Sequence, residues 1–253
     1  MKNLYDKSKI KFSLIWIIIY VVGASLADAL SAIIGIEKCV TVVFLLILTI
    51  ILLNWLLKHN LNVEYGLCKP TQNPKYFLYY IPLVVLISVN LWFGISVNFG
   101  LLESLLYATS MLLVGFVEEL IFRGFLFKAL QENSLKTAVI VSSITFGMGH
   151  IINLFSGANT INTICQIFYA ITTGFLFVII FYKSKSLLPC IITHSLFNAL
   201  STISNTVNIS TTYSIIIALA IMAITIVYSV IIIKLTPKNQ PTIINEEQKK
   251  ETA

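Results

Sequence analysis

One apolar stretch of this sequence, Ser110–Leu130, contains two adjacent carboxylates and an arginine. Each charged side chain placed at the middle of a bilayer costs about 3 kcal/mol on insertion scales, so the three together need a physical reason. Glu119 and Arg123 are four residues apart, which puts them on one helix face where they can neutralise each other. Glu118 points about 100° away from that face and has no partner on its own helix. We therefore expect Glu118 to be the carboxylate that is free for chemistry.

The composition indicates that the chain lies in a bilayer. The chain has 253 residues, of which 57% are hydrophobic and 11% charged, and its mean hydropathy is +0.90. A soluble domain of this length cannot bury so much apolar surface, so we predict an all-α, polytopic membrane protein. The formal net charge is +6, but the lysines stand singly beside apolar runs. We expect membrane lipid as a partner and no nucleic acid.

Apolar runs of spanning length predict about eight transmembrane helices in one bundle. If the N-terminus is cytoplasmic, 16 of the 17 Lys and Arg residues fall on that side, and Lys38 alone falls outside. An odd number of spans would break this pattern, so we expect both termini to be cytoplasmic. The first run is too long for a signal peptide, and we expect an uncleaved anchor. The predicted helices cover roughly residues 12–36, 40–57, 77–94, 103–130, 137–153, 161–182, 187–204 and 212–234.

Two further helices carry polar groups that suit a free glutamate. One ends in Phe-Gly-Met-Gly-His, residues 146–150, where two glycines permit a neighbouring helix to approach the imidazole closely. The other carries His194 and Asn198 on one face, four residues apart. Counted at 1.5 Å per residue from the nearest cytoplasmic lysine, Glu118, His150, His194 and Asn198 lie roughly 13–21 Å deep. We expect these four side chains to form one site.

The chemistry open to such a site is narrow. A carboxylate can take a proton from water, while two imidazoles and an amide can hold that water, hold a metal behind it, or stabilise a carbonyl oxygen. This combination predicts hydrolysis of an amide or ester, and no serine or cysteine stands in a recognisable nucleophile motif. Two alternatives stay open: a membrane scaffold in which the polar groups serve for assembly, and a proton-coupled transporter.

In order and spacing, the three motifs resemble the EExxxR, FxxxH and HxxxN motifs of the CPBP family of intramembrane proteases, also called CAAX-processing or Abi proteins. The matching residues are Glu118 to Arg123, Phe146 to His150 and His194 to Asn198. That family includes prenyl endopeptidases that trim prenylated CAAX proteins, and bacterial members linked to bacteriocin processing, self-immunity and peptide maturation. The resemblance implies an intramembrane endopeptidase.

The resemblance also implies roles for the matching residues. Glu118 would activate the water, and Glu119 with Arg123 would shape the site. His150, His194 and Asn198 would hold the water or a metal. If a metal such as zinc is present, His150, His194 and Glu118 would be its ligands, and a metal-free water stays the alternative.

The hydropathy pattern and the resemblance together divide the chain into four parts. Residues 1–99 would hold the first three helices with an interfacial loop, 100–205 the catalytic core, 206–236 the last helix, and 237–253 a disordered cytoplasmic tail. The Ile-, Asn- and Lys-rich composition is typical of a low-GC bacterium, where prenylated CAAX proteins are not expected. We therefore expect a membrane-associated peptide or protein substrate of the bacteriocin type and a place in the bacterial plasma membrane.

Overall fold

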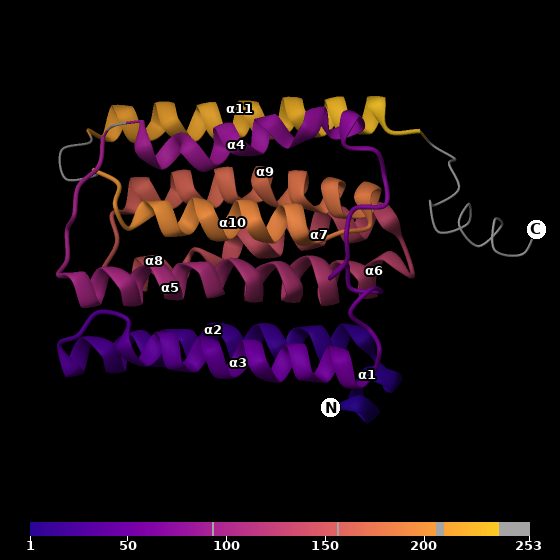
Figure 1. The fold of residues 1–253 in the computed structure, drawn as a ribbon, viewed down its shortest axis with the longest axis horizontal. Helices are drawn as coiled ribbons and strands as arrows, with labels where there is room; N and C mark the ends of the chain where they lie inside the picture. The colour runs from indigo at the N-terminus through magenta and orange to yellow at the C-terminus, as the bar shows by residue number, and fades with distance from the viewer. Residues whose placement is uncertain (93, 156, 206–209, 238–253) are drawn as a thin grey trace, which may run out of the picture.

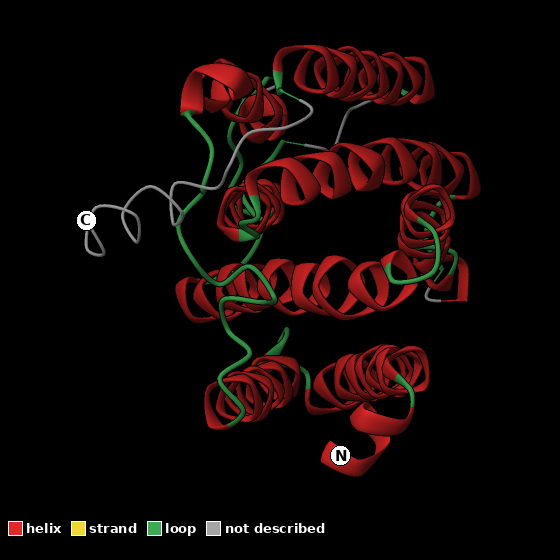
Figure 2. Cartoon of the chain, turned by 90° about the vertical axis from the view of Figure 1, so that its right-hand side faces the viewer, coloured by secondary structure: helices red, strands yellow, loops and turns green. Residues whose placement is uncertain are grey.

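The computed structural model describes residues 1–92, 94–155, 157–205 and 210–237. Every regular element in these residues is a helix, and the only strand-like contact among them is an isolated antiparallel bridge from Ile95 to Ser204 (Figure 2). The long helices run nearly side by side, with α2 and α3 in an outer layer and α4 and α11 in the opposite one (Figure 1). The elements are α1 Lys2–Lys7, α2 Lys9–Ile34, α3 Cys39–Lys58, η1 Pro74–Tyr80, α4 Ile81–Ser88, η2 Val89–Leu91, α5 Leu101–Glu118, η3 Glu119–Phe127, α6 Lys128–Gln131, α7 Leu135–Gly149, α8 Ile152–Phe155, α9 Thr160–Ser184, α10 Leu188–Ser201 and α11 Thr211–Leu235.

The prediction of an all-α protein with many spans is confirmed at the level of its helices. Seven helical stretches within the described residues are long and apolar enough to cross a membrane. Each of the eight predicted helices is present, but α10 has only 14 residues, fewer than the roughly 20 that cross a bilayer. The seven long stretches are Lys9–Ile34, Cys39–Lys58, Pro74–Leu91, Leu101–Gln131, Leu135–Phe155, Thr160–Ser184 and Thr211–Leu235.

The short α10 is possible because the chain beneath it is folded against the bundle. The predicted interfacial loop between α3 and η1 tucks under the start of α10, where the Leu187 amide donates to the Gly66 carbonyl at 2.8 Å. The Thr71 amide likewise donates to the Ser184 carbonyl at the end of α9. Backbone groups at the start of α10 and the end of α9 therefore bond with protein groups. A helix that ended in lipid would find no such partners.

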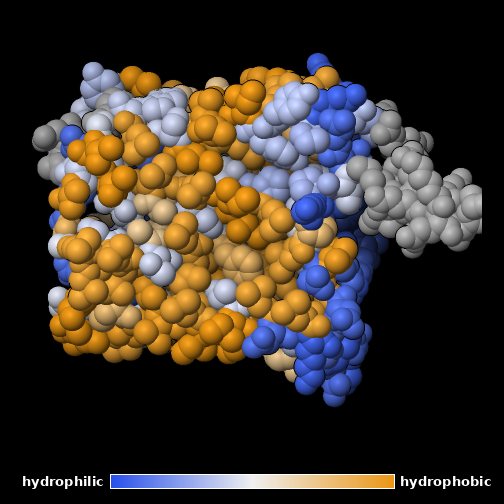
Figure 3. Space-filling view, in the orientation of Figure 1, coloured by the Kyte–Doolittle hydropathy of each residue, from blue (hydrophilic) through white to orange (hydrophobic). Residues whose placement is uncertain are grey.

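The surface is apolar around the bundle and hydrophilic at one end (Figure 3). That polar end holds the N-terminus, α6 and the end of α11, and Lys9 forms an ion pair there with Glu132 at 2.5 Å (Figure 1). Lys38 lies at the opposite end, between α2 and α3. Its ammonium binds Asp28 at 2.8 Å, so Asp28, which is partly exposed, has a partner that the sequence alone did not indicate.

Aromatic side chains dock the N-terminal helices onto the helix that carries the charges. Phe125 in η3 makes edge contacts with Phe12 of α2 at 5.1 Å and with Tyr65 of the interfacial loop at 5.0 Å between ring centroids. Edge-to-face rings at such distances add directional stability to apolar burial. The predicted disordered tail, 237–253, lies outside the described residues except for Pro237.

Two native cysteines test the predicted orientation, since Cys39 begins α3 at the end opposite the lysines and Cys68 lies in the interfacial loop. In single-cysteine variants on intact cells, an impermeant maleimide should label Cys39 and should label Cys68 only after permeabilisation. Burial raises the pKa of the Cys68 thiol, so less thiolate forms near neutral pH and its labelling will be slow. Labelling of Cys68 in intact cells, with Cys39 protected, would mean that the orientation is inverted.

Candidate active site

Glu118, Glu119 and Arg123 lie on one continuous helix, which changes from α-helical to π-helical winding at the site. Leu101–Glu118 is α-helical, and a π-helical segment, η3, begins at Glu119 and runs to Phe127. Such π-helical turns are rare and occur frequently at functional sites. The sequence motifs did not predict this change of winding, but every residue of η3 is buried, so the wider turn lies wholly inside the bundle.

The predicted ion pair is present. The Arg123 Nη1 donates to Glu119 Oε1 at 2.9 Å, and both side chains are completely buried. The guanidinium also lies over the ring of Phe146, with 3.8 Å from Cζ to the centroid, and at 5.6 Å from that of Phe177. Aromatic faces stabilise a desolvated cation. The charge of Arg123 is thereby neutralised by Glu119, and its guanidinium is enclosed by the two aromatic rings.

His194 connects the two glutamates. Its Nδ1 lies 2.8 Å from Glu119 Oε1, the same oxygen that binds Arg123, and its Nε2 lies 3.5 Å from Glu118 Oε2. A carboxylate paired with a guanidinium is ionised and can only accept, so His194 Nδ1 must carry a proton. In the neutral imidazole, Nε2 then presents its lone pair toward Glu118.

A glycine brings α10 close enough for these contacts. A Cβ on Gly115 of α5 would lie 2.5 Å from the backbone nitrogen of Ser195, so only glycine permits this approach. The Ser195 hydroxyl donates to the Leu112 carbonyl at 2.8 Å. Ser195 thus fixes one helix on the other and uses the O–H that a nucleophile would need.

Glu118 is not as free as its position on the helix suggested. The Tyr20 hydroxyl of α2 donates to Glu118 Oε1 at 2.5 Å, while Oε2 is buried and accepts no hydrogen bond from any described residue. The motifs did not reveal Tyr20. A depth count puts Tyr20 only at a similar level, since nine residues from Lys11 place it about 14 Å deep, close to the value for Glu118.

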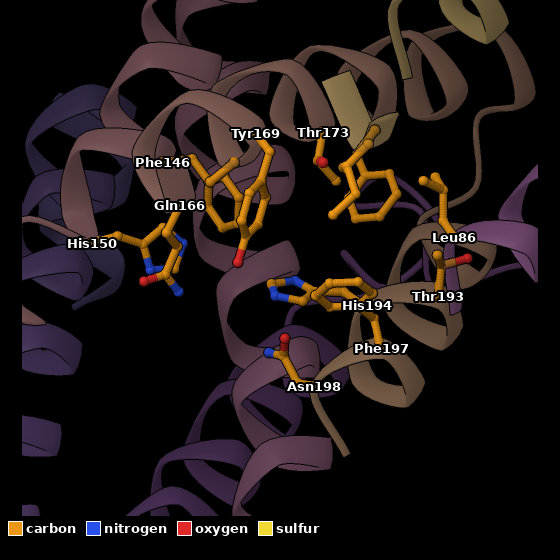
Figure 4. Close-up of a pocket in the computed structure, with 13 residues that line it drawn as sticks. Leu86, Phe146, His150, Gln166, Tyr169, Thr173, Thr193, His194, Phe197 and Asn198 are labelled. Atoms are coloured by element: carbon orange, nitrogen blue, oxygen red, sulfur yellow. The ribbon is translucent and has the colours of Figure 1, made fainter. Parts of the chain in front are cut away.

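Residues from five helices enclose a cavity beside these glutamates (Figure 4). Its volume is about 60 Å³, enough for a few water molecules. The predicted His150, His194 and Asn198 all line it, whereas Glu118 does not, and His194 is the lining residue that approaches Glu118. Phe146 also lines it and begins the FxxxH motif. The remaining lining residues were not predicted, and the polar ones among them come mainly from α9. They are Leu86, Gln166, Tyr169, Ala170, Thr173, Phe177, Thr193, Phe197 and Ile221.

His150 reaches the cavity from the end of α7. The ring of Phe146 stands between the two imidazoles, with its centroid 5.6 Å from that of His150 and 5.6 Å from that of His194. Gly147 permits α7 to approach α9, because a Cβ there would lie 2.8 Å from the Ile171 nitrogen. The same expectation for Gly149 is wrong, since a Cβ there would meet nothing within 4 Å.

The predicted metal ligands do not fit a metal in this arrangement. Across the described ranges, no three His, Cys, Asp or Glu side chains lie close enough together to hold a metal ion. Glu118 and His194 approach each other, but they offer only two donors, and Glu118 Oε1 is already bound by Tyr20. Zinc or another divalent metal stays a prediction.

Removal of one member of the buried Glu119–Arg123 pair should cost more stability than removal of both charges. Arg123→Met leaves the Glu119 carboxylate without its cation, and should lower the free energy of unfolding by about 3–5 kcal/mol. Adding Glu119→Gln should recover most of that loss, because neither charge then remains buried. The exposed pair Lys2–Asp6 is the control, and Lys2→Met should cost less than about 1 kcal/mol. Unfolding in mixed micelles measures these three variants against the wild type, and a double variant no more stable than Arg123→Met would contradict the pairing.

Comparison with known proteins identifies the region that contains this site. No curated protein and no solved structure matches the chain. Residues 100–200, less than half of the chain, match the family described as type II CAAX prenyl endopeptidase Rce1-like. The matched residues include the charged helix, His150, His194 and Asn198, whereas Tyr20 lies outside them. The chain therefore carries, at residues 100–200, a domain of the Rce1-like type II CAAX prenyl endopeptidase (CPBP) family, a family of proteases.

Proposed function

We propose that this protein is an intramembrane endopeptidase that hydrolyses a peptide bond with water activated by Glu118. The observation that carries the proposal is the unpartnered Oε2 of Glu118, buried 3.5 Å from Nε2 of a histidine whose other nitrogen is held by Glu119. A buried carboxylate oxygen without a donor is costly. A water beside these two atoms that donates to both Oε2 and Nε2 would satisfy them and would stand ready for deprotonation.

The steps follow from these positions. Glu118 Oε2 takes a proton from the water as the hydroxyl attacks the scissile carbonyl, and later gives that proton to the leaving amine. Negative charge develops on the carbonyl oxygen, and the side chains of His150 and Asn198 line the cavity where that oxygen would lie. Donors held in place before the reaction stabilise such charge without reorganisation. Glu119 and Arg123 act indirectly, by orienting His194.

The lining of the cavity suits a side chain of a peptide more than a soluble metabolite. Its wall combines phenylalanine, leucine and isoleucine side chains with the polar groups of Gln166, Tyr169 and Thr173. Apolar walls accept the side chains of a segment that comes from the membrane, and the polar groups can bind its backbone. We propose a membrane-associated peptide or protein as the substrate, of the bacteriocin or maturing-peptide class rather than a prenylated CAAX protein, processed at the bacterial plasma membrane.

Loss of the base should abolish cleavage without loss of the fold. Glu118→Gln keeps the shape and the acceptor for Tyr20 but cannot take a proton, so the rate should fall by about 10²–10⁴-fold. The control is Glu103→Gln, in the first turn of the same helix. Quantitative mass spectrometry of new peptide termini in membranes from cells with each variant measures the result. Termini that persist with Glu118→Gln at the level of the wild type would refute the assignment and favour a scaffold.

The two cavity histidines should behave as one unit. His150→Ala and His194→Ala should each remove most of the activity, and the double variant should be little worse than either, as expected for residues that act as a unit in one site. His59, at the end of α3 and outside the cavity, provides the control, and His59→Ala should keep full activity. Losses that multiply in the double variant would show that the two imidazoles do not share a site.

A further inference from the structure

A residue far outside the family domain makes the shortest contact to the proposed base. Tyr20 lies in α2, 98 positions before Glu118, and its hydroxyl donates to Glu118 Oε1 at 2.5 Å. Its side chain is buried, with 7% of the residue exposed. The residues that match the family begin at position 100, so the family motifs contain no information about this donor.

The placement of Tyr20 is built into the packing of α2. Phe12, Trp16 and Tyr20 follow at intervals of four and form one buried stripe along the helix. Phe12 contacts Trp16 at 6.1 Å and Phe125 of η3 at 5.1 Å between ring centroids. The stripe thus holds α2 on the charged helix and brings the phenol to the depth of the glutamates.

A hydrogen bond at one oxygen decides what the other oxygen can do. With Oε1 held by Tyr20, the carboxylate plane is fixed and Oε2 faces His194 Nε2 at 3.5 Å. Without that donor the carboxylate could rotate about its last bond, because no other described residue donates to either oxygen. A base must lie within hydrogen-bond reach of the proton it takes, so this rotation would remove it from the water.

We propose that Tyr20 is a positioning residue for the Glu118 base, so that the N-terminal helices complete an active site whose other residues come from the family domain. This inference rests on the proposed function for its effect on rate, but the hydrogen bond itself does not. A tyrosine that merely fills space would contribute to stability and would leave the rate constant of the bound substrate unchanged.

The test compares two buried tyrosines that each donate one hydrogen bond. Tyr20→Phe removes only the hydroxyl and should lower kcat by about 10–100-fold, the size expected for one lost bond to a charged group, with KM within about twofold. Tyr228→Phe is the matched control, since the Tyr228 hydroxyl of α11 donates to the Phe77 carbonyl at 2.6 Å. It should lower Tm and leave kcat unchanged. The probe is a quenched peptide that spans a cleavage site found by the comparison of membrane peptide termini.

A stability measurement separates this inference from the proposed function. Tyr20→Phe should lower Tm in the wild-type background, because Glu118 loses its donor. In a Glu118→Leu background the phenol has no acceptor, and the same substitution should leave Tm unchanged or raise it. This difference between the two backgrounds without any proteolysis would support the contact while the proposed function fails. An equal loss of Tm in both backgrounds, or full kcat in Tyr20→Phe, would overturn the proposal.

A second variant covers the case in which Tyr20→Phe does not fold. A fluorinated tyrosine at position 20 keeps the shape and strengthens the O–H donor. The infrared carboxylate band of Glu118, identified as the band absent from Glu118→Gln, should then shift from its wild-type position. An unchanged band would show that the phenol does not donate to Glu118 and would equally overturn the proposal.

Discussion

One carboxylate oxygen organises the interior of this protein. Glu119 Oε1 accepts from Arg123 at 2.9 Å and lies 2.8 Å from His194 Nδ1. Neither the carboxylate nor the guanidinium touches solvent, so each group can stay charged only because the other pairs with it. The histidine is oriented by the same oxygen and extends this pair to Glu118. Loss of either Glu119 or Arg123 leaves a buried charge without a partner, which makes the network both a structural and a chemical requirement.

The rest of the fold brings this network together and keeps lipid away from it. Gly115 lets α10 approach α5 closely, and Gly147 does the same for α7 and α9. Phe146 lies over the guanidinium and stands between the two imidazoles. In a membrane, helices associate through such close packing and through interhelical hydrogen bonds, since lipid offers no alternative partner to a polar group. Small residues and polar residues therefore occur together here for one physical reason.

Part of this site could be predicted from the spacing of residues along single helices, and part could not. The Glu119–Arg123 pair depends only on a separation of four residues, and the depth of His194 only on the rise per residue, so both could be predicted. The contact of His194 with both glutamates depends on how α10 is rotated against α5, which Gly115 and Ser195 decide. The π-helical turn at Glu119, the short α10 and the contact from Tyr20 arise from packing between segments far apart in the chain. No periodicity within one segment contains that information.

The protonation of His194 is the most direct test of this network, because Glu119 Oε1 must accept a hydrogen bond from the Nδ1–H of His194 and Nε2 must face Glu118. The chain has only three histidines, so ¹⁵N-histidine NMR in detergent micelles can resolve each ring, with His150→Asn and His194→Asn for assignment. We predict a proton on Nδ1 of His194 that changes its hydrogen bonding when Glu119 is replaced by glutamine. A spectrum in which Nδ1 of His194 carries no proton would contradict the network on which the proposed chemistry rests.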